Sequence, residues 1–254
     1  MKKERNKYNN IWQVITTIII IAFVLISNHF TQDEEKIGNQ NSVEENVNQS
    51  QNQIIDLSSI PEYKESPYVE INDNKPYFTE EEYKAEPFER YSNWDSLGRS
   101  GVAYANICKE IMPKSREKRE DITSVKDLSG WIQKRYDSLI KDKYLYNRCH
   151  LIGWQLAGEN ANKQNLITGT RYLNTEGMLP FENLVADYIK GNNKNHVLYR
   201  VTPIYNGNNL LASGVEMEAW SVEDNGQGIC FNIYCYNVQP GITINYETGE
   251  SNIT

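Results

Sequence analysis

The last third of the chain carries a period-two pattern that restricts the fold more than any other feature. Four side chains alternate along residues 229–238 and share one face of a predicted strand, namely Ile229, Phe231, Ile233 and Cys235. Residues 196–205 and 214–222 are also predicted strands. A helix is predicted over 180–190, because Pro180 suits a first helical turn. Strands and a helix without an alternating strand–helix rhythm predict an α+β fold.

The N-terminal part differs in composition from the rest. A basic tail (1–10) precedes an uncharged apolar run (11–27), and a stretch rich in Asn, Gln and Glu follows (28–58). The run is at the short end for crossing a bilayer and slightly long for a signal peptide. Its positive flank favours an inside N-terminus. We expect a cytoplasmic tail, a transmembrane anchor or cleaved signal, a flexible tether, and one domain over 59–254. That domain would lie outside the membrane, or be secreted after cleavage.

Cysteines occur only in this exported part, where disulfides are permitted. Cys230 and Cys235 are an odd number of residues apart on one predicted strand, so they face opposite sides and cannot bridge each other. The chain has no CxxC spacing, which argues against a zinc ribbon.

Charge is unevenly distributed along the chain. The net charge is −8, yet residues 109–148 hold eleven basic and seven acidic side chains. The basic residues are densest from Lys114 and Arg116 to Arg119, just upstream of His150. Such a lobe could receive a polyanion, although an ordinary solvated surface is the alternative. The acidic segment 62–89 could cover that lobe.

His150 and Asn174 are the residues most suited to chemistry. His150 ends a predicted strand over 145–152, where Cys149 and His150 point to opposite faces. Imidazole has a pKa near neutrality and can act as a general base. Asn174 follows 24 residues later, and its carboxamide oxygen is a suitable ligand for a hydrated Mg²⁺. A structural histidine and a capping asparagine are the alternatives.

The segment 147–190 resembles the DNA/RNA non-specific endonucleases of the ββα-metal (His-Me finger) class. It is most similar to the secreted or surface-anchored bacterial branch with streptococcal DNases and DNA-entry nucleases. Residues 98–105, 199–203 and 214–219 also resemble that branch. Many members carry Asp-Arg-Gly-His where this chain has Asn-Arg-Cys-His at 147–150. The resemblance implies a central antiparallel sheet flanked by helices, with a finger of two strands and a helix.

The resemblance also implies a mechanism. His150 would be the general base, Asn174 the ligand of one Mg²⁺ or Mn²⁺, and Glu182 a second catalytic residue on the same helix. Gly177 and Pro180 are expected to break that helix between Asn174 and Glu182. We expect Arg171, one turn before Asn174, to act in catalysis and to contact phosphate. The other predicted nucleic-acid contacts are Arg148, Lys114 and Arg116, whereas Arg200 is expected to pair with an internal acid.

The resemblance therefore predicts an endonuclease that hydrolyses DNA and RNA and leaves 5′-phosphate ends. No helix-turn-helix, zinc-finger or RRM signature appears, which favours sequence-independent, salt-sensitive binding. No small-molecule cofactor is expected. Further predicted partners are the membrane, through 11–27, and a DNA-uptake machinery or an inhibitor protein. A surface module of the same fold that binds nucleic acid without cutting it is the alternative function.

Overall fold

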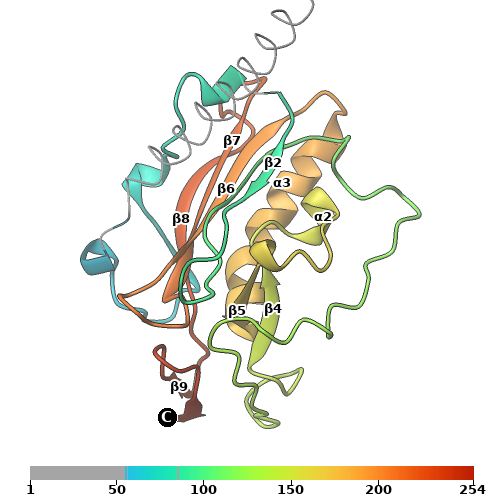
Figure 1. Ribbon diagram of the computed structural model, residues 1–254. Coiled ribbons are helices and arrows are strands. Elements are labelled where there is room, and N and C mark those ends of the chain that lie inside the picture. The colour runs from blue at the N-terminus through green and yellow to red at the C-terminus, as the bar shows by residue number, and fades with distance from the viewer. Residues whose placement is uncertain (1–54, 56, 85) are drawn as a thin grey trace, which may run out of the picture. The chain divides into compact units, whose positions relative to one another are not determined.

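Six strands form the central sheet (Figure 1), as seen in a computed structural model that describes residue 55, residues 57–84 and residues 86–254. In sheet order the strands are β1 (Tyr68–Glu70), β8 (Cys230–Tyr236), β7 (Gly214–Ser221), β6 (Val197–Ile204), β3 (Ala103–Ile107) and β2 (Glu89–Tyr91). Every neighbouring pair is antiparallel. The three strands predicted from the last third of the sequence are confirmed as the adjacent strands β6, β7 and β8. The central antiparallel sheet of the predicted α+β fold is also confirmed.

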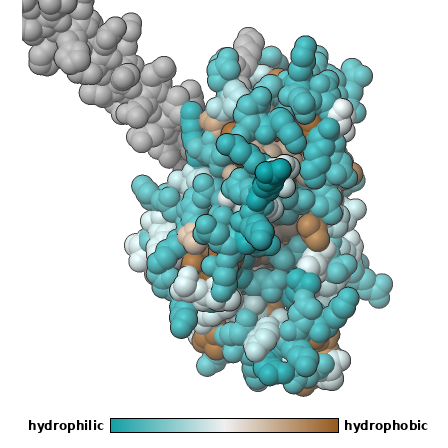
Figure 2. Space-filling model, turned by 90° about the vertical axis from the view of Figure 1, so that its right-hand side faces the viewer, coloured by the Kyte–Doolittle hydropathy of each residue, from teal (hydrophilic) through white to brown (hydrophobic). Residues whose placement is uncertain are grey.

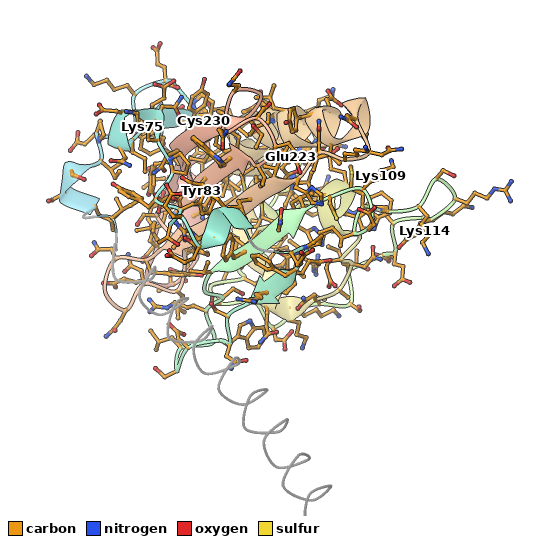
Figure 3. The ribbon with its side chains drawn as sticks, turned by 90° about the horizontal axis from the view of Figure 1, so that it is seen from above. Lys75, Tyr83, Lys109, Lys114, Glu223 and Cys230 are labelled. Carbon is orange, nitrogen blue, oxygen red and sulfur yellow. The ribbon has the colours of Figure 1, made fainter. Side chains whose placement is uncertain are left out.

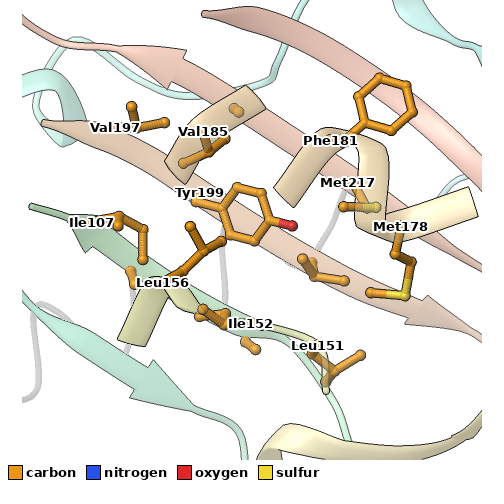
Figure 4. Close-up of a cluster of buried hydrophobic side chains, with 14 of the residues drawn as sticks. Ile107, Leu151, Ile152, Leu156, Met178, Phe181, Val185, Val197, Tyr199 and Met217 are labelled. Atoms are coloured by element: carbon orange, nitrogen blue, oxygen red, sulfur yellow. The ribbon is translucent and has the colours of Figure 1, made fainter. Parts of the chain in front are cut away.

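The main hydrophobic core lies between one face of this sheet and a helix, α3 (Leu179–Gly191). The strand alternation places Tyr199 and Met217 on that face, and Val185 of α3 packs in the same cluster (Figure 4). All three side chains are fully buried. Burial of one large apolar side chain contributes about 1.5–3 kcal/mol. This core fixes the position of α3 over the sheet.

A separate two-stranded ribbon consists of β4 (Tyr146–His150) and β5 (Leu166–Thr170), paired antiparallel with His150 opposite Leu166. The connection between them contains α2 (Trp154–Ala157) and η4 (Lys163–Asn165). The buried carboxamide of Asn165 accepts a hydrogen bond from the Ile152 N–H (2.8 Å) and donates to the Ile152 carbonyl (2.9 Å). These bonds pin the connection directly after His150.

The helix that follows β5 is continuous, so the predicted break at Gly177 and Pro180 is wrong. Helical backbone runs from residue 171 to 191, with a π-helical segment, η5 (Leu173–Met178), that leads directly into α3. Within η5 the Leu179 N–H donates to the carbonyl of Asn174, five residues back. The widened turn ends just before Pro180, which therefore occupies the first turn of α3, where a missing N–H is tolerated.

The second face of the sheet is covered by the acidic segment, which is not the predicted position over the basic lobe. Phe78 and Phe88 pack there with Tyr104 of β3. Between β1 and Phe78 the chain forms a 3₁₀ turn, η2 (Asn72–Asn74), which is followed by irregular backbone. A further 3₁₀ turn, η3 (Glu82–Lys84), follows Thr79.

The C-terminal residues form a hairpin of β9 (Ile242–Ile244) and β10 (Ser251–Ile253), and η1 (Leu57–Ser59) lies near the start of the described chain. The hairpin supports β4, because the Tyr146 hydroxyl donates to the Gly249 carbonyl at 2.9 Å. Gly249 has φ +89°, and an added Cβ would lie 1.9 Å from the Gly130 carbonyl oxygen. Only glycine fits this approach of two chain segments.

The predicted tail (1–10) and apolar run (11–27), and nearly all of the predicted tether (28–58), lie outside the described residues. Among the residues that are described, no helix combines the length and the apolar composition needed to cross a membrane. The four cysteines, at 108, 149, 230 and 235, are all free thiols.

Candidate active site

A pocket of about 880 Å³ opens between the β4–β5 ribbon, the helix 171–191 and the loop before β4. Its lining includes the predicted site residues His150, Asn174, Glu182, Arg148 and Arg171, and one arginine not singled out for a role, Arg119. The side of the molecule that carries the long loop of Figure 1 is hydrophilic over most of its surface (Figure 2). The fold thus brings together residues that are 63 positions apart, from Arg119 to Glu182.

His150 is oriented by two hydrogen bonds. Its Nε2 lies 2.8 Å from the carbonyl oxygen of Asn160, an acceptor only, so Nε2 carries the proton. The other nitrogen, Nδ1, is then unprotonated, and Arg119 Nη2 lies 3.3 Å from it. The backbone carbonyl therefore fixes the ring and makes Nδ1 the basic atom, whose single lone pair receives an Arg119 N–H in this structure.

Burial lowers the pKa of His150 to about 4. The side chain is 5% exposed. Removal from water disfavours the imidazolium, the bond to Asn160 opposes this effect, and the nearby charge of Arg119 reinforces it. His150 is therefore neutral at pH 7 and able to accept a proton.

Asn174 and Glu182 line the same pocket because of the π-helical turn. In a regular α-helix, residues eight apart differ by about 80° around the axis. A π turn accommodates one additional residue, so the spacing behaves like seven residues and the difference falls to about 20°. The widened turn thus places both side chains on one helix face.

Glu182 is buried against the backbone of Gly153, where an added Cβ would lie 2.5 Å from the carboxylate oxygen Oε2. Burial raises the pKa of Glu182 to about 7, while a hydrogen bond from Gln155 and the charge of Arg119 act in the opposite direction. Gly153 is therefore needed for space rather than for backbone conformation, since its φ is −57°. A positive charge placed in the pocket would favour the ionised carboxylate.

The donor atoms in the pocket fit a hydrated divalent cation. Asn174 offers its carboxamide oxygen and Glu182 its carboxylate, both hard oxygen ligands. Within the described residues, no group of three or more His, Cys, Asp and Glu side chains could enclose a metal. A cation here would keep most of its waters, which is the habit of Mg²⁺.

The arginines differ in how far they are already paired. Arg171 binds Asp142 at 2.6 Å. Arg148 donates to the carbonyls of Val125 and Thr123 and stacks on Trp131, with its guanidinium carbon 4.4 Å from the ring centre. Through these contacts Arg148 holds the loop that precedes β4 against the ribbon. They engage two of its five N–H donors, and its predicted phosphate contact stays a prediction.

Lys114 and Arg116 are exposed and are not among the residues that line the pocket. Lys114 lies far out on the projecting loop (Figure 3). Sequence reasoning placed Arg119 in the basic run but gave it no role. Its position in the basic run was the only indication of a role, because the tertiary fold decides which residue of that run lies beside His150.

Comparison with known proteins gives a consistent result. A family model described as DNA/RNA non-specific endonuclease matches residues 79–223. A curated deoxyribonuclease from Streptococcus dysgalactiae subsp. equisimilis is 29% identical over 196 residues, which cover 63% of this chain and 59% of the relative. The chain thus spans less than two thirds of that relative's length.

Solved structures are similar over most of the chain. NucA from Streptococcus agalactiae with a bound magnesium ion has a TM-score of 0.65 and 23% identity, and the match covers 82% of this chain and 95% of NucA. The Sda1 nuclease with a bound zinc ion has a TM-score of 0.62 and 27% identity, covering 74% and 97%. The first match bears on the fold alone.

Proposed function

Because the chain belongs to the DNA/RNA non-specific endonuclease family, we propose that it is a metal-dependent endonuclease that cuts DNA and RNA without sequence preference and leaves 5′-phosphate ends. The observation that carries this proposal is the state of His150. It is neutral and held by the Asn160 carbonyl, and it shares a pocket with Asn174 and Glu182. Family membership also confirms the resemblance inferred from residues 147–190.

In the proposed reaction, the Arg119 N–H leaves Nδ1 for a phosphoryl oxygen of the substrate, and His150 Nδ1 then accepts a proton from a water molecule, whose oxygen attacks the scissile phosphorus in line. The bond from phosphorus to the 3′ oxygen breaks, and that oxygen takes a proton from solvent. Arg119 places positive charge beside the attacking side, where negative charge develops on the phosphoryl oxygens. General-base catalysis by one positioned side chain contributes about 10²–10⁴-fold.

Asn174 and Glu182 are proposed to hold Mg²⁺ or Mn²⁺ together with waters. When bound, such an ion supplies positive charge that stabilises the transition state and the departing oxygen. NucA and Sda1 support this proposal because their structures contain magnesium and zinc, respectively. Glu182 would ionise more readily beside the cation, which offsets the effect of its burial.

Substrate binding is proposed to use the phosphate backbone, which carries no sequence information. Arg119 and Arg171 are placed to contribute, and Lys114 and Arg116 could contact a longer strand outside the pocket. The predicted location outside the membrane, anchored by 11–27 or secreted, remains a proposal. So do the predicted links to DNA uptake and to an inhibitor protein.

The test is digestion of circular plasmid DNA and total RNA by the purified protein with Mg²⁺, with EDTA, and after His150→Ala. His196→Ala is the matched control, because His196 pairs with Glu223 at 2.5 Å and does not line the pocket. We expect cleavage that needs the metal and is lost only in the His150 variant. Intact substrate together with salt-sensitive binding would favour the non-cutting module instead.

A further inference from the structure

Cys149 occupies the motif position at which many family members have glycine, and its thiol contacts the proposed metal ligand. The Cys149 Sγ lies 3.1 Å from the carboxamide oxygen Oδ1 of Asn174 and donates to it. The residue is fully buried in the main core. This contact joins the ribbon strand β4 to the π-helical turn, the two parts that carry the chemistry.

The thiol fits its site closely. Met178 Sδ lies 3.8 Å from Cys149 Sγ on one side. On the facing strand β5, an added Cβ at Gly169 would lie 2.7 Å from the Cys149 Cβ. Gly169 is the register partner of Asn147 and so a diagonal neighbour of Cys149 across the ribbon, and its lack of a side chain leaves room for the thiol beside Asn174.

The thiol is also kept in its donor form. An ordinary thiol loses its proton only near about pH 8.5, so Sγ carries its hydrogen at neutral pH. A protonated thiol can donate one hydrogen bond, and Asn174 Oδ1 has two lone pairs to receive it and a second partner. One lone pair is occupied by Cys149, which leaves the other for a ligand in the pocket.

We propose that Cys149 is a positioning residue that orients the Asn174 carboxamide for metal binding by donating its thiol hydrogen to Oδ1. The inference rests on the proposed function, in which Asn174 is a metal ligand. Side chains that hydrogen-bond to a ligand fix its orientation, and their loss typically lowers metal affinity or activity about 10–100-fold. A thiol is a weak donor, which places the expected effect at the lower end.

The experiment compares Cys149→Ala, Cys149→Ser and Cys235→Ala in the full chain. Cys235 is the matched control, because it is a fully buried thiol of the same core and donates to Met217 Sδ at 3.6 Å. Mn²⁺ binding without nucleic acid is followed by the electron paramagnetic resonance signal of the free ion. Plasmid cleavage is then measured against Mg²⁺ concentration, and thermal unfolding reports folding of each variant.

We expect Cys149→Ala to weaken Mn²⁺ binding about tenfold and to raise the half-saturating Mg²⁺ concentration equally, with kcat at saturating Mg²⁺ largely restored. Cys149→Ser keeps a donor and should bind like the unmodified protein. Cys235→Ala should lose stability without losing affinity.

Unchanged affinity in Cys149→Ala overturns the inference, and so does an equal loss in Cys235→Ala or in Cys149→Ser. Absence of Mn²⁺ binding by the unmodified protein would instead remove the metal from the proposed function, and the inference with it. The two failures are therefore distinguishable.

Discussion

The central sheet separates two groups of buried ionisable side chains that are used in different ways. On one side, His150 and Glu182 line an open pocket. On the other side, Arg200 donates two hydrogen bonds to Glu218, from Nε at 2.6 Å and from Nη2 at 3.0 Å. Arg200 was expected to pair with an internal acid, and this expectation is confirmed.

Both groups have shifted pKa values, so a shift alone does not identify the active site. Burial raises the pKa of Glu216, beside Glu218, to about 8, and the charge of Glu218 adds to this effect. The difference lies in access and pairing. Arg200 and Glu218 satisfy each other under the segment 75–88, whereas the His150 base and the Glu182 carboxylate face space that a substrate could enter.

The largest expected effect is the loss of catalysis on substitution of His150 in the pocket. His150→Ala should lower kcat by about 10²–10⁴-fold, because a positioned general base is removed. Stability should also fall, by about 1–3 kcal/mol, because the ring is buried and makes hydrogen bonds with Asn160 and Arg119. Single-turnover cleavage and denaturant unfolding measure the two quantities, and a folded variant with unimpaired cleavage would mean that His150 is not the base.

Substitution in the Arg200–Glu218 cluster on the second face should lower stability rather than catalysis. Arg200→Ala leaves Glu218 buried without its partner, which should lower the free energy of unfolding by about 3–5 kcal/mol. Arg135→Ala is the control, because its ion pair with Asp137 is more than half exposed and should contribute only about 0–1 kcal/mol. Urea unfolding measures both. Equal losses in the two variants would contradict the contrast between the faces.

Part of the difference between the two faces of the sheet could be predicted from the sequence. The alternation along 229–238 predicts which side chains of β8 enter the core, and Ile229, Phe231, Ile233 and Cys235 all do so. The motif at 147–150 also predicted that His150 and Cys149 point in opposite directions, as they do. These features depend on local periodicity, which a sequence displays directly.

Features that depend on tertiary packing were not accessible. Gly177 and Pro180 ordinarily end a helix, but here Gly177 packs closely on β8, with an added Cβ only 3.4 Å from the Cys235 Cβ. That close packing favours a continuous helix with a π turn. Arg119 is one of several nearby basic residues, and no local pattern selects the one that reaches His150. No local pattern predicted the hydrogen bonds from Arg148 to the carbonyl oxygens of the preceding loop either.

A smaller effect is the pH dependence of the free energy of unfolding that Glu216, on the second face of the sheet, should cause. A native pKa of about 8 at Glu216 means that the folded protein holds a proton which the unfolded chain has released above about pH 4.5. The unfolded state then binds fewer protons, so stability falls as pH rises through this interval and stops falling above pH 8.

His150 has the opposite sign, because its lowered pKa makes stability rise with pH, but only between about 4 and 6.5. Glu182 acts like Glu216 but only up to about pH 7. Between pH 7 and 8 the Glu216 contribution is therefore larger than that of Glu182, and we expect a loss on the order of 1 kcal/mol. Urea unfolding at both pH values should show this loss in the unmodified protein and not in Glu216→Gln. An equal decline in both proteins would assign it to another group.

The smallest expected effect tests whether Arg171 belongs to the pocket's chemistry or to its structure. Asp142 is about half exposed, with 52% of its side chain accessible, and it occupies Arg171 at 2.6 Å. A phosphate would have to replace or share this carboxylate. If Arg171 serves the substrate, Asp142→Asn frees a cation and removes a repelling charge, so affinity should rise a few-fold, within about 1 kcal/mol. The gain should shrink as salt screens the charges.

Binding of a short duplex is measured with His150→Ala present throughout, so that the substrate stays intact. Asp137→Asn is the control, because Asp137 pairs with Arg135 and does not line the pocket. Equal gains in both variants would reflect only net charge. Weaker binding after Asp142→Asn would mean that the ion pair holds Arg171 in place. In that case Arg171, like Arg200, would use its charge to hold the fold together. Charged side chains with a structural role would then occur in the pocket as well as on the second face of the sheet.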